Sequence, residues 1–443
     1  MLSKTFYIAS IFFPAMAEAG DKVRITTKEK EIYGILMPNE SSSSIFIKLD
    51  SGYNIGISKK KIREIKVVEP KREKKEKKKT VKEKKGLKKI AILHTGGTIA
   101  SKVDYRTGGV FSDFTPEELL AMFPELKNIA NIDSVFISNM WSDDIRFGNF
   151  GVIANAIQKE AKNGADGIIV GMGTDNLAVA AAALSFIVEK TPVPIIFVGA
   201  QRSSDRGSSD AGMNLICAAR FIACSEFRGV AICMHHKSDD EICAILPATK
   251  TKKLHSSRRD AFKPVNAGPI ALIDYKNNKI NMEEEADSRE KELLIKPKME
   301  EKVGILKIHV NMFPEQIRFY RGYNGLVLEG TGLGQTPGHV PNEEAKDNEG
   351  IFQAIKELID SGCVILMTTG CLFGRVNMNI YDKGRDLLKL GVIPGEDMLP
   401  ETAFVKLAWL LGNYPKDKVK ELLKENLRGE ISDRSLYKED FLE

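Results

Sequence analysis

The chain has 443 residues, of which 43% are hydrophobic, and it carries a formal net charge of +5. This length allows two or three domains with substantial cores, and the composition is typical of a globular protein. Ten Lys or Arg residues and only four Glu residues fall between residues 69 and 85. The rest of the chain is close to neutral, so its folded parts carry no basic bias.

Residues 1–16 stand apart from the rest of the sequence. Their apolar stretch at residues 5–15 resembles a short signal peptide, and the competing interpretation is an extended gene start with the native chain beginning at Met16. The stretch is too short to span a bilayer as a helix. We favour an extended start or spurious leader, because the remaining sequence is typical of an intracellular protein, and we expect no membrane association.

The six cysteines include no CxxC pair, and the six histidines show no metal-ligand spacing. We therefore infer no structural metal. Several cysteines lie in apolar runs, as Cys217 and Cys233 do. We expect small core residues in a reduced compartment, which the cytoplasm provides.

Residues 17–69 contain short strands separated by turn clusters. Strands are predicted at residues 22–26, 33–38 and 44–49, a pattern typical of a small β-barrel that serves as a binding or docking module. Residues 70–87 form a charged linker with almost no apolar side chains. Such a segment cannot bury enough surface to order itself. We favour a solvated tether over a contact with RNA phosphates, because Glu residues interrupt the basic run.

From residue 88 the pattern alternates between strand and helix, which predicts an α/β architecture with a parallel sheet. Strands are expected at residues 90–94, 135–138, 167–170, 194–198, 230–234, 303–310, 325–328 and 363–367. Helices are expected at residues 115–123, 150–163, 176–188, 212–223, 350–361 and 417–427. The charged stretch 282–299 is expected to link a larger lobe, residues 88–285, to a smaller one, residues 286–443. The glycine-rich segment 330–334 is expected to be a tight turn rather than a dinucleotide loop.

The strand at residues 90–94 is followed by Gly96, Gly97 and Thr98. A strand that ends in a glycine turn exposes its next side chains at the carboxyl edge of a sheet, where open α/β folds place their sites. Glycines let the backbone approach a ligand and free its N–H groups for a developing oxyanion. Thr98 is thus either a nucleophile that needs a base or the N-cap of a following helix.

A second strand with the same pattern delivers Thr174 beside Asp175, and a loop carries a lysine cluster that includes Lys253. This set of side chains suits acyl transfer: one threonine attacks a carboxamide, and a second threonine, linked to a Lys–Asp pair, relays its proton. The alternative is that Thr174 and Asp175 merely cap the helix that begins near residue 176.

These segments resemble two signatures of the bacterial-type L-asparaginase family: TGGTIA at residues 95–100 and GTD at residues 173–175. Four further blocks resemble the D subunits of archaeal glutamyl-tRNA(Gln) amidotransferases: QRSSDR at 201–206, SSDA at 208–211, GRVNMNIY at 374–381 and EDMLPETA at 396–403. The N-terminal barrel and linker match the same subunits. The resemblance implies a two-lobed, asparaginase-like parallel-sheet domain preceded by a small β-barrel.

The resemblance also implies roles for single residues. Thr98 corresponds to the primary nucleophile, and the catalytic relay corresponds to Thr174, Asp175 and Lys253. The implied substrate-binding residues are Gly97, Ser142, Asp143 and Gly173, and Tyr105 matches a lid tyrosine. The chain departs from the family pattern at Met172 and Asn176, where the family usually has His and Thr.

The function that the resemblance implies is release of ammonia from glutamine, or asparagine, for a partner. That partner is an E subunit, which binds Glu-tRNA(Gln) and activates it with ATP and Mg²⁺, so this chain needs no cofactor of its own. A self-dimer within a heterotetramer is expected. One alternative is a stand-alone cytoplasmic L-asparaginase, and another is a catalytically silent protein that docks tRNA or protein.

Overall fold

A computed structural model describes residues 17–37, 43–49, 54–69, 83–97, 102–103, 110–111, 116–202, 208–283, 290–435 and 437. The chain divides into two compact units, which are described separately. The larger unit comprises Thr80–Ser101, Ser112–Ser204 and Ser208–Glu443. The proposed leader 1–16 and most of the charged linker lie outside the described residues.

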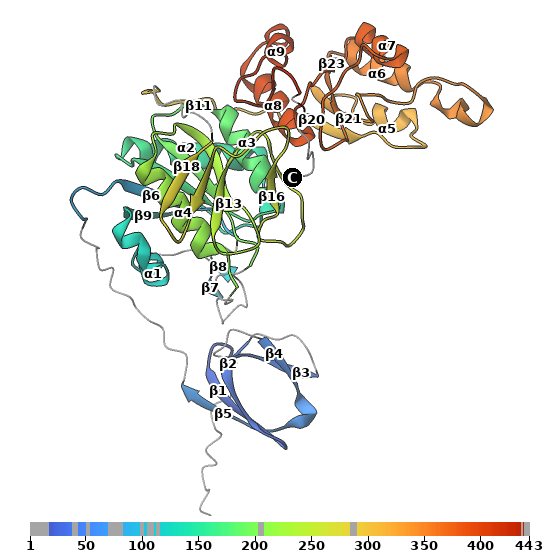
Figure 1. Ribbon diagram of the computed structural model, residues 1–443. Helices are drawn as coiled ribbons and strands as arrows, with labels where there is room; N and C mark the ends of the chain where they lie inside the picture. The colour runs from blue at the N-terminus through green and yellow to red at the C-terminus, as the bar shows by residue number, and fades with distance from the viewer. Residues whose placement is uncertain are drawn as a thin grey trace, which may run out of the picture. The chain divides into compact units, whose positions relative to one another are not determined.

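The smaller unit contains an antiparallel sheet that curls round on itself (Figure 1). Its strand order is β4-β3-β2-β1-β5, and its small core contains Val23, Ile25, Ile47 and Ile57. The three predicted strands are present, although the second begins at Glu31 and ends at Leu36, and two further strands follow them. The strands are β1 (Lys22–Thr27), β2 (Glu31–Leu36), β3 (Ser44–Lys48), β4 (Asn54–Ser58) and β5 (Ile62–Glu69), with the 3-10 turn η1 (Lys59–Lys61) before β5. The same unit includes β7 (Lys102–Val103) and β8 (Val110–Phe111).

An eight-stranded sheet forms the centre of the larger unit, in the order β18-β17-β14-β13-β12-β10-β6-β9. Neighbouring strands from β9 to β13 run parallel, as the alternating pattern predicts. They are β6 (Lys89–His94), β9 (Asn131–Phe136), β10 (Gly167–Gly171), β12 (Pro194–Val198) and β13 (Gly229–His235). The last three strands pair antiparallel and extend the parallel part of the sheet at one edge. They are β14 (Ile242–Pro247), β17 (Ala271–Asp274) and β18 (Lys279–Met282).

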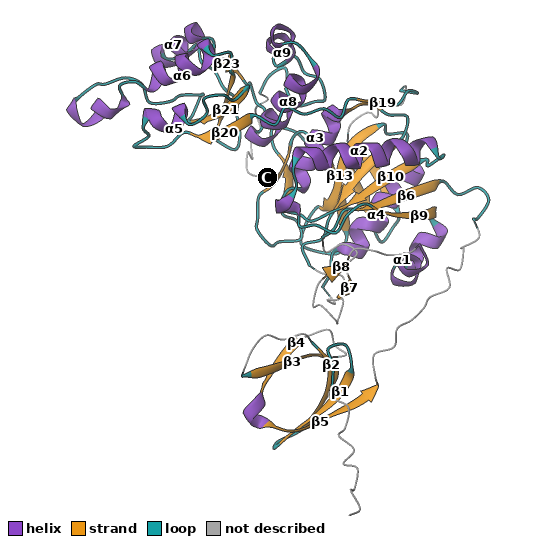
Figure 2. Ribbon diagram, turned by 180° about the vertical axis from the view of Figure 1, so that it is seen from behind, coloured by secondary structure: helices purple, strands orange, loops and turns teal. Residues whose placement is uncertain are grey.

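Helices cover both faces of this sheet (Figure 2). On one face lie α2 (Phe147–Lys162) and α3 (Leu177–Ile187), whose buried side chains share a core with the second lobe. On the other face lie α1 (Pro116–Met122), η2 (Pro124–Asn128) and α4 (Ala211–Cys224). Two-stranded pairs border the sheet: β11 (Val188–Lys190) with β19 (Leu294–Ile295), and β15 (Thr251–Lys253) with β16 (Phe262–Pro264).

The second lobe is built on a parallel sheet of four strands in sequence order. They are β20 (Val303–Lys307), β21 (Gly325–Gly330), β22 (Val364–Thr369) and β23 (Ile393–Pro394). Its helices are α5 (Pro314–Arg318), η4 (Glu343–Asn348), α6 (Ile351–Asp360), α7 (Asp382–Leu390), α8 (Pro400–Asn413) and α9 (Lys416–Leu422). Buried side chains of α8 share one core with α3, so the two lobes pack together through these helices.

The structure corrects several finer expectations. The strand predicted to reach residue 310 ends at Lys307, and the helix predicted to reach residue 427 ends at Leu422. Cys224 and Cys371 are exposed because they lie at a helix end and in a loop, whereas the other four cysteines are buried. Segment 330–334 is a tight turn, with an isolated bridge from Thr331 to Gln335.

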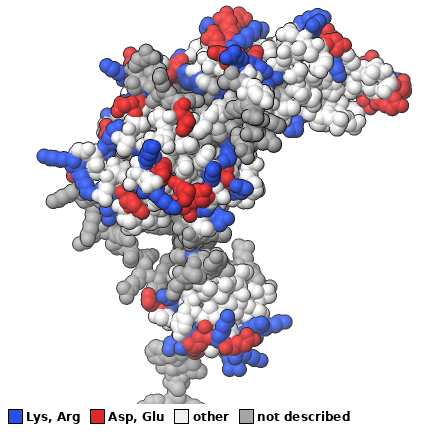
Figure 3. All heavy atoms as spheres, viewed as in Figure 1, with Lys and Arg blue, Asp and Glu red and all other residues white. Residues whose placement is uncertain are grey.

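Acidic and basic side chains alternate over the face of the molecule shown in Figure 3. In the part of the chain that the structure describes, no helix has both the length and the apolar character that a membrane span requires.

Candidate active site

Two glycine turns meet at the carboxyl edge of the large sheet. Thr95 follows β6 and binds the neighbouring strand twice, because its N–H and its hydroxyl both donate to the carbonyl of Gly171 at 3.0 and 3.1 Å. Gly97 has a φ of +82°, and a Cβ built on it would lie 2.3 Å from the nitrogen of Gly173. A side chain at position 97 would therefore push the two turns apart.

Two expected site residues cannot be placed. Thr98, the expected nucleophile, directly follows Gly97, but it lies outside the described residues, and so does the expected lid residue Tyr105. Their roles stay predictions. The last described residue before position 98 is Gly97, which packs against Gly173.

The three expected relay residues come together at this edge. Lys253, the last residue of β15, donates from Nζ to Thr174 Oγ1 at 2.9 Å and to Asp175 Oδ1 at 2.8 Å. The Lys253 side chain is 14% exposed and that of Asp175 is 69% exposed, so a largely buried lysine binds a carboxylate that is open to solvent. Lys253 lies 79 residues from Thr174 in the sequence, and the fold alone makes them neighbours.

Ser142 supports the turn that carries the relay. It lies in the 3-10 turn η3 (Ser142–Asp144) and is 4% exposed. Its Oγ accepts the N–H groups of Asp175 and Asn176 at 3.2 and 3.4 Å, and its carbonyl accepts from the side-chain amide of Asn176 at 2.9 Å. Asp143, beside it, is exposed. The structure thus gives Ser142 a positioning contact, while the expected binding of substrate by both residues stays a prediction.

The helix-capping alternative for Thr174 and Asp175 is not supported. The N-cap of α3 is Asn176, and this helix start has no side-chain cap hydrogen bond. Asn176 instead uses its amide to hold Ser142. The departure from the family pattern at position 176 therefore has a structural use.

Sequence reasoning missed one supporting residue, Gly199, which follows β12. A Cβ built on Gly199 would lie 2.9 Å from Thr174 Cγ2 and 2.8 Å from Leu177 Cδ1. A side chain at position 199 would therefore have to displace Thr174 or Leu177, so the end of β12 lies close against Thr174. A glycine directly after a buried strand is the signal that indicates such packing.

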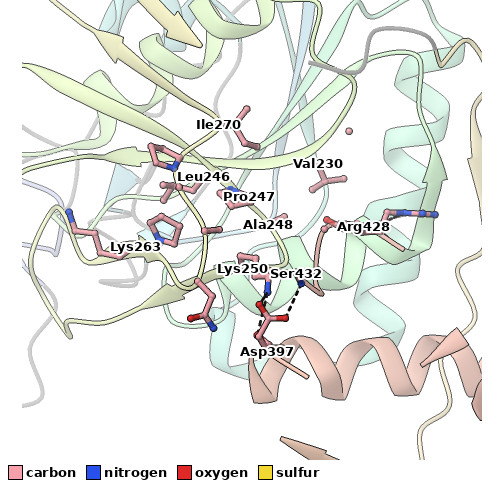
Figure 4. A pocket seen from close by; sticks show the side chains of 18 of the residues that line it. Val230, Leu246, Pro247, Ala248, Lys250, Lys263, Ile270, Asp397, Arg428 and Ser432 are labelled. Atoms are coloured by element: carbon pink, nitrogen blue, oxygen red, sulfur yellow. Dashed lines mark hydrogen bonds and ion pairs between the residues drawn. The ribbon is translucent and has the colours of Figure 1, made fainter. Parts of the chain in front are cut away.

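A cavity of about 1320 Å³ lies between the two lobes (Figure 4). Lys250 and Leu254, which flank β15, line the cavity, whereas the side chain of Lys253 binds Thr174 instead. In the cavity wall, Lys250 Nζ and Asp397 Oδ2 form an ion pair of 2.6 Å, and both side chains are 3% exposed. Burial lowers the pKa of Lys250. Burial alone would raise the pKa of Asp397, but hydrogen bonds from Lys250 and Ser432 hold it below its ordinary value.

The described residues offer no cluster of three or more His, Cys, Asp or Glu side chains that could hold a metal ion. What the edge does offer is a hydroxyl, a lysine ammonium and a carboxylate in hydrogen-bond contact. Such a set can move a proton to or from a group bound beside Thr174.

Three family models match the chain: "GatD N-terminal domain" over residues 17–68, "Asparaginase, N-terminal" over residues 89–288, and "Glutaminase/Asparaginase C-terminal domain" over residues 302–423. The chain is 43% identical to the D subunit of glutamyl-tRNA(Gln) amidotransferase from Methanococcus maripaludis, across 94% of this chain and 98% of that one. The corresponding D subunit from Pyrococcus furiosus is 44% identical, across 94% and 95% of the two chains.

Solved structures of L-asparaginases share the fold of the larger unit. The enzyme of Thermococcus kodakarensis superimposes with a TM-score of 0.69 at 29% identity and covers 78% of this chain and 99% of its own. L-asparaginase I of Vibrio cholerae gives a TM-score of 0.64 at 27% identity, with 78% and 100% covered. These comparisons identify the fold and the relatives of the chain, and the roles of its individual site residues stay predictions.

Proposed function

We propose a function on the premise that the chain belongs to the family of glutamyl-tRNA(Gln) amidotransferase D subunits, whose members it matches over nearly their whole length. The chain is an asparaginase-like subunit of a tRNA-dependent amidotransferase. It removes the amide group of glutamine, or of asparagine, and the ammonia converts Glu-tRNA(Gln) to Gln-tRNA(Gln).

The observation that carries the amide chemistry is the contact of Lys253 Nζ with both Thr174 Oγ1 and Asp175 Oδ1. In our proposal, Thr98 attacks the carboxamide carbon and loses its hydroxyl proton through Thr174. Asp175 and Lys253 orient the Thr174 hydroxyl and share the proton during transfer. The C–N bond of the tetrahedral intermediate then breaks, ammonia leaves with the proton, and water hydrolyses the ester on Thr98.

The remaining components of the reaction belong to a partner. We assign tRNA binding and activation of the glutamyl group to an E subunit that uses ATP and Mg²⁺, and we assign no cofactor to this chain. We further propose that two copies of this chain assemble within a heterotetramer and that the complex works in the cytoplasm. The names of the relatives support a complex of several subunits.

The deciding experiment combines the full chain with an E subunit from the same organism. The complex should form Gln-tRNA from Glu-tRNA, ATP and glutamine. Thr98→Ala should stop the glutamine-dependent reaction but leave the complex assembled and able to use free ammonium. Normal glutamine hydrolysis by Thr98→Ala would refute Thr98 as the nucleophile. If free ammonium could not replace glutamine, the assignment of amide hydrolysis to this chain and of tRNA activation to the E subunit would be wrong.

A second candidate is a stand-alone L-asparaginase, which the similarity to the Thermococcus and Vibrio enzymes favours. Those structures cover 78% of this chain. The family model that matches residues 17–68 carries the name of the amidotransferase component instead. High asparagine turnover by the isolated chain, unchanged by the E subunit and by tRNA, would favour the second candidate.

A further inference from the structure

Five polar side chains form a continuous path behind the relay. Three of them are fully buried, and none is needed for the amide chemistry described above. In order along the path they are Asp210, Asn214, His235, Asp240 and Arg259. Buried polar groups of this kind must be hydrogen-bonded, and a fully connected set holds its members in a single arrangement.

One end of the path supports the end of β12. The carboxylate of Asp210 accepts the N–H groups of Gln201 and Arg202, both at 3.0 Å. The amide group of Asn214 donates to Asp210 Oδ2 at 3.2 Å and to the carbonyl of Gly199 at 3.0 Å. Gly199 is the residue that packs against Thr174. This end therefore fixes the backbone that backs the relay threonine.

The middle of the path is His235, which has 0% exposure. Its Nδ1 lies 2.6 Å from Asn214 Oδ1, and because the Asn214 amide nitrogen already donates to two acceptors, this His nitrogen must be the donor. Its Nε2 lies 3.4 Å from Asp240 Oδ1, and these two atoms are hydrogen-bonded only when Nε2 also carries a proton, that is, when His235 is the imidazolium cation. Burial lowers the pKa of His235, although the nearby carboxylates of Asp210 and Asp240 oppose this shift.

The other end of the path holds the hairpin that presents Lys253. Arg259 lies between β15 and β16, and its Nη1 donates to Asp240 Oδ1 at 2.5 Å while its Nη2 donates to the carbonyl of Ser238. The hairpin forms a separate two-stranded sheet with three residue pairs. A two-stranded hairpin is marginally stable by itself, so Lys253 depends on such ties for its position.

We propose that this path, from Asp210 to Arg259, positions Thr174 and Lys253 against each other, with Arg259 as the positioning residue for Lys253. The inference rests on the proposed function, because it presumes that the contact between these two side chains serves amide hydrolysis. A displacement of about 1 Å in a catalytic group lowers a rate by as much as about 100-fold. Loss of the Arg259 tie should lower turnover while substrate binding is retained, because the expected substrate binders lie on other segments.

The test measures glutamine and asparagine hydrolysis by the full chain with its partner. Arg259→Met should lower kcat by about tenfold or more, with KM within about twofold of the wild type, as expected for a misplaced relay. Arg259→Lys should recover part of the loss, because an ammonium group can still reach Asp240. Arg220→Met is the matched control: Arg220 donates to the carbonyl of Tyr275 at 2.7 Å, away from the hairpin, and its kcat should stay within about twofold.

A double-mutant cycle separates positioning from general damage. If Arg259 acts through Lys253, Arg259→Met should have almost no further effect in a Lys253→Met background. Normal kcat in Arg259→Met, or two independent losses that multiply, would overturn the inference. Normal activity in Lys253→Met alone would instead overturn the relay of the proposed function, so the two failures are distinguishable.

Discussion

Lys250 and Lys253 lie three residues apart, yet they belong to two different regions of the molecule. At the lobe junction, Lys250 forms an ion pair with Asp397 in which both side chains are almost completely buried. At the sheet edge, Lys253 binds a hydroxyl and a carboxylate that is mostly exposed. The two groups of the buried pair neutralise each other in the cavity wall, whereas the proposed relay at the sheet edge would exchange a proton with a bound molecule. Burial and the choice of partner, rather than residue type, make Lys250 a structural lysine and Lys253 the candidate for the proposed chemistry.

The largest effect should follow from removing the edge contact. Thr174→Val and Lys253→Met should each lower amide hydrolysis by roughly two to four orders of magnitude, the usual contribution of positioned proton transfer. Because the residues act as a unit, the double variant should be close to either single one. Steady-state kinetics checks this, with thermal unfolding as the control for folding. Losses that multiply would show two separate roles and would remove the distinction between the two lysines.

The lobe junction should respond in stability rather than in rate. Asp397→Asn leaves Lys250 buried beside a neutral amide, and breaking a buried pair in this way costs about 3–5 kcal/mol. Urea denaturation should show that loss, while kcat per folded molecule stays near that of the wild type. Replacing both partners, with Lys250→Met and Asp397→Leu, should recover much of the stability. A large fall in kcat with unchanged stability would place Lys250 in the chemistry.

The sequence predicts the parallel part of the fold well because each strand there is a buried apolar run bounded by turns. The expectation for residues 194–198 matches β12 at both ends. The helix at Pro400–Asn413 is absent from the predicted elements because residues 405–410 are all buried and leave no clear polar face in the sequence, and the helix packs on α3 of the other lobe. Strands β14, β17 and β18 escape prediction because they pair antiparallel without helices between them, so the sequence there shows no alternation of strand and helix.

Some residues of the candidate site can likewise be predicted from the local sequence, and others cannot. Thr174 and Asp175 stand out locally because they follow a strand and a glycine. Lys253 can be assigned only through the family resemblance, since no local pattern links it to a threonine 79 residues away. Arg259 reaches Asp240, 19 residues away, only because the fold brings their segments together. Contacts between distant segments are the part of a site that local pattern does not specify.

The lobe junction should also give the stability a dependence on pH. The pKa of Asp397 in the folded chain lies below its ordinary value of 3.8, so its stabilisation is fully present above the unfolded value and is lost as pH falls through the folded one. Unfolding free energies measured between pH 6 and about 3 should fall less steeply in Asp397→Asn. If the unfolding free energy depended on pH equally in both proteins, the ion pair with Lys250 would not lower the pKa of Asp397.

The smallest effect is expected at a surface carboxylate that shares the chemistry of Asp397 but not its burial. Glu357 accepts hydrogen bonds from Arg318 at 3.1 Å and from Arg321 at 2.9 Å, and these two guanidinium groups lower its pKa to about 2. Solvent screens exposed pairs, so Glu357→Gln should change the melting temperature little at neutral pH, and less still in high salt. The small contribution of Glu357 to the free energy of unfolding should disappear as pH falls from about 4.5 toward 2. NMR titration of the Glu357 carboxyl can follow its protonation. A loss of stability as large as that of Asp397→Asn would mean that burial is not what distinguishes the lobe junction.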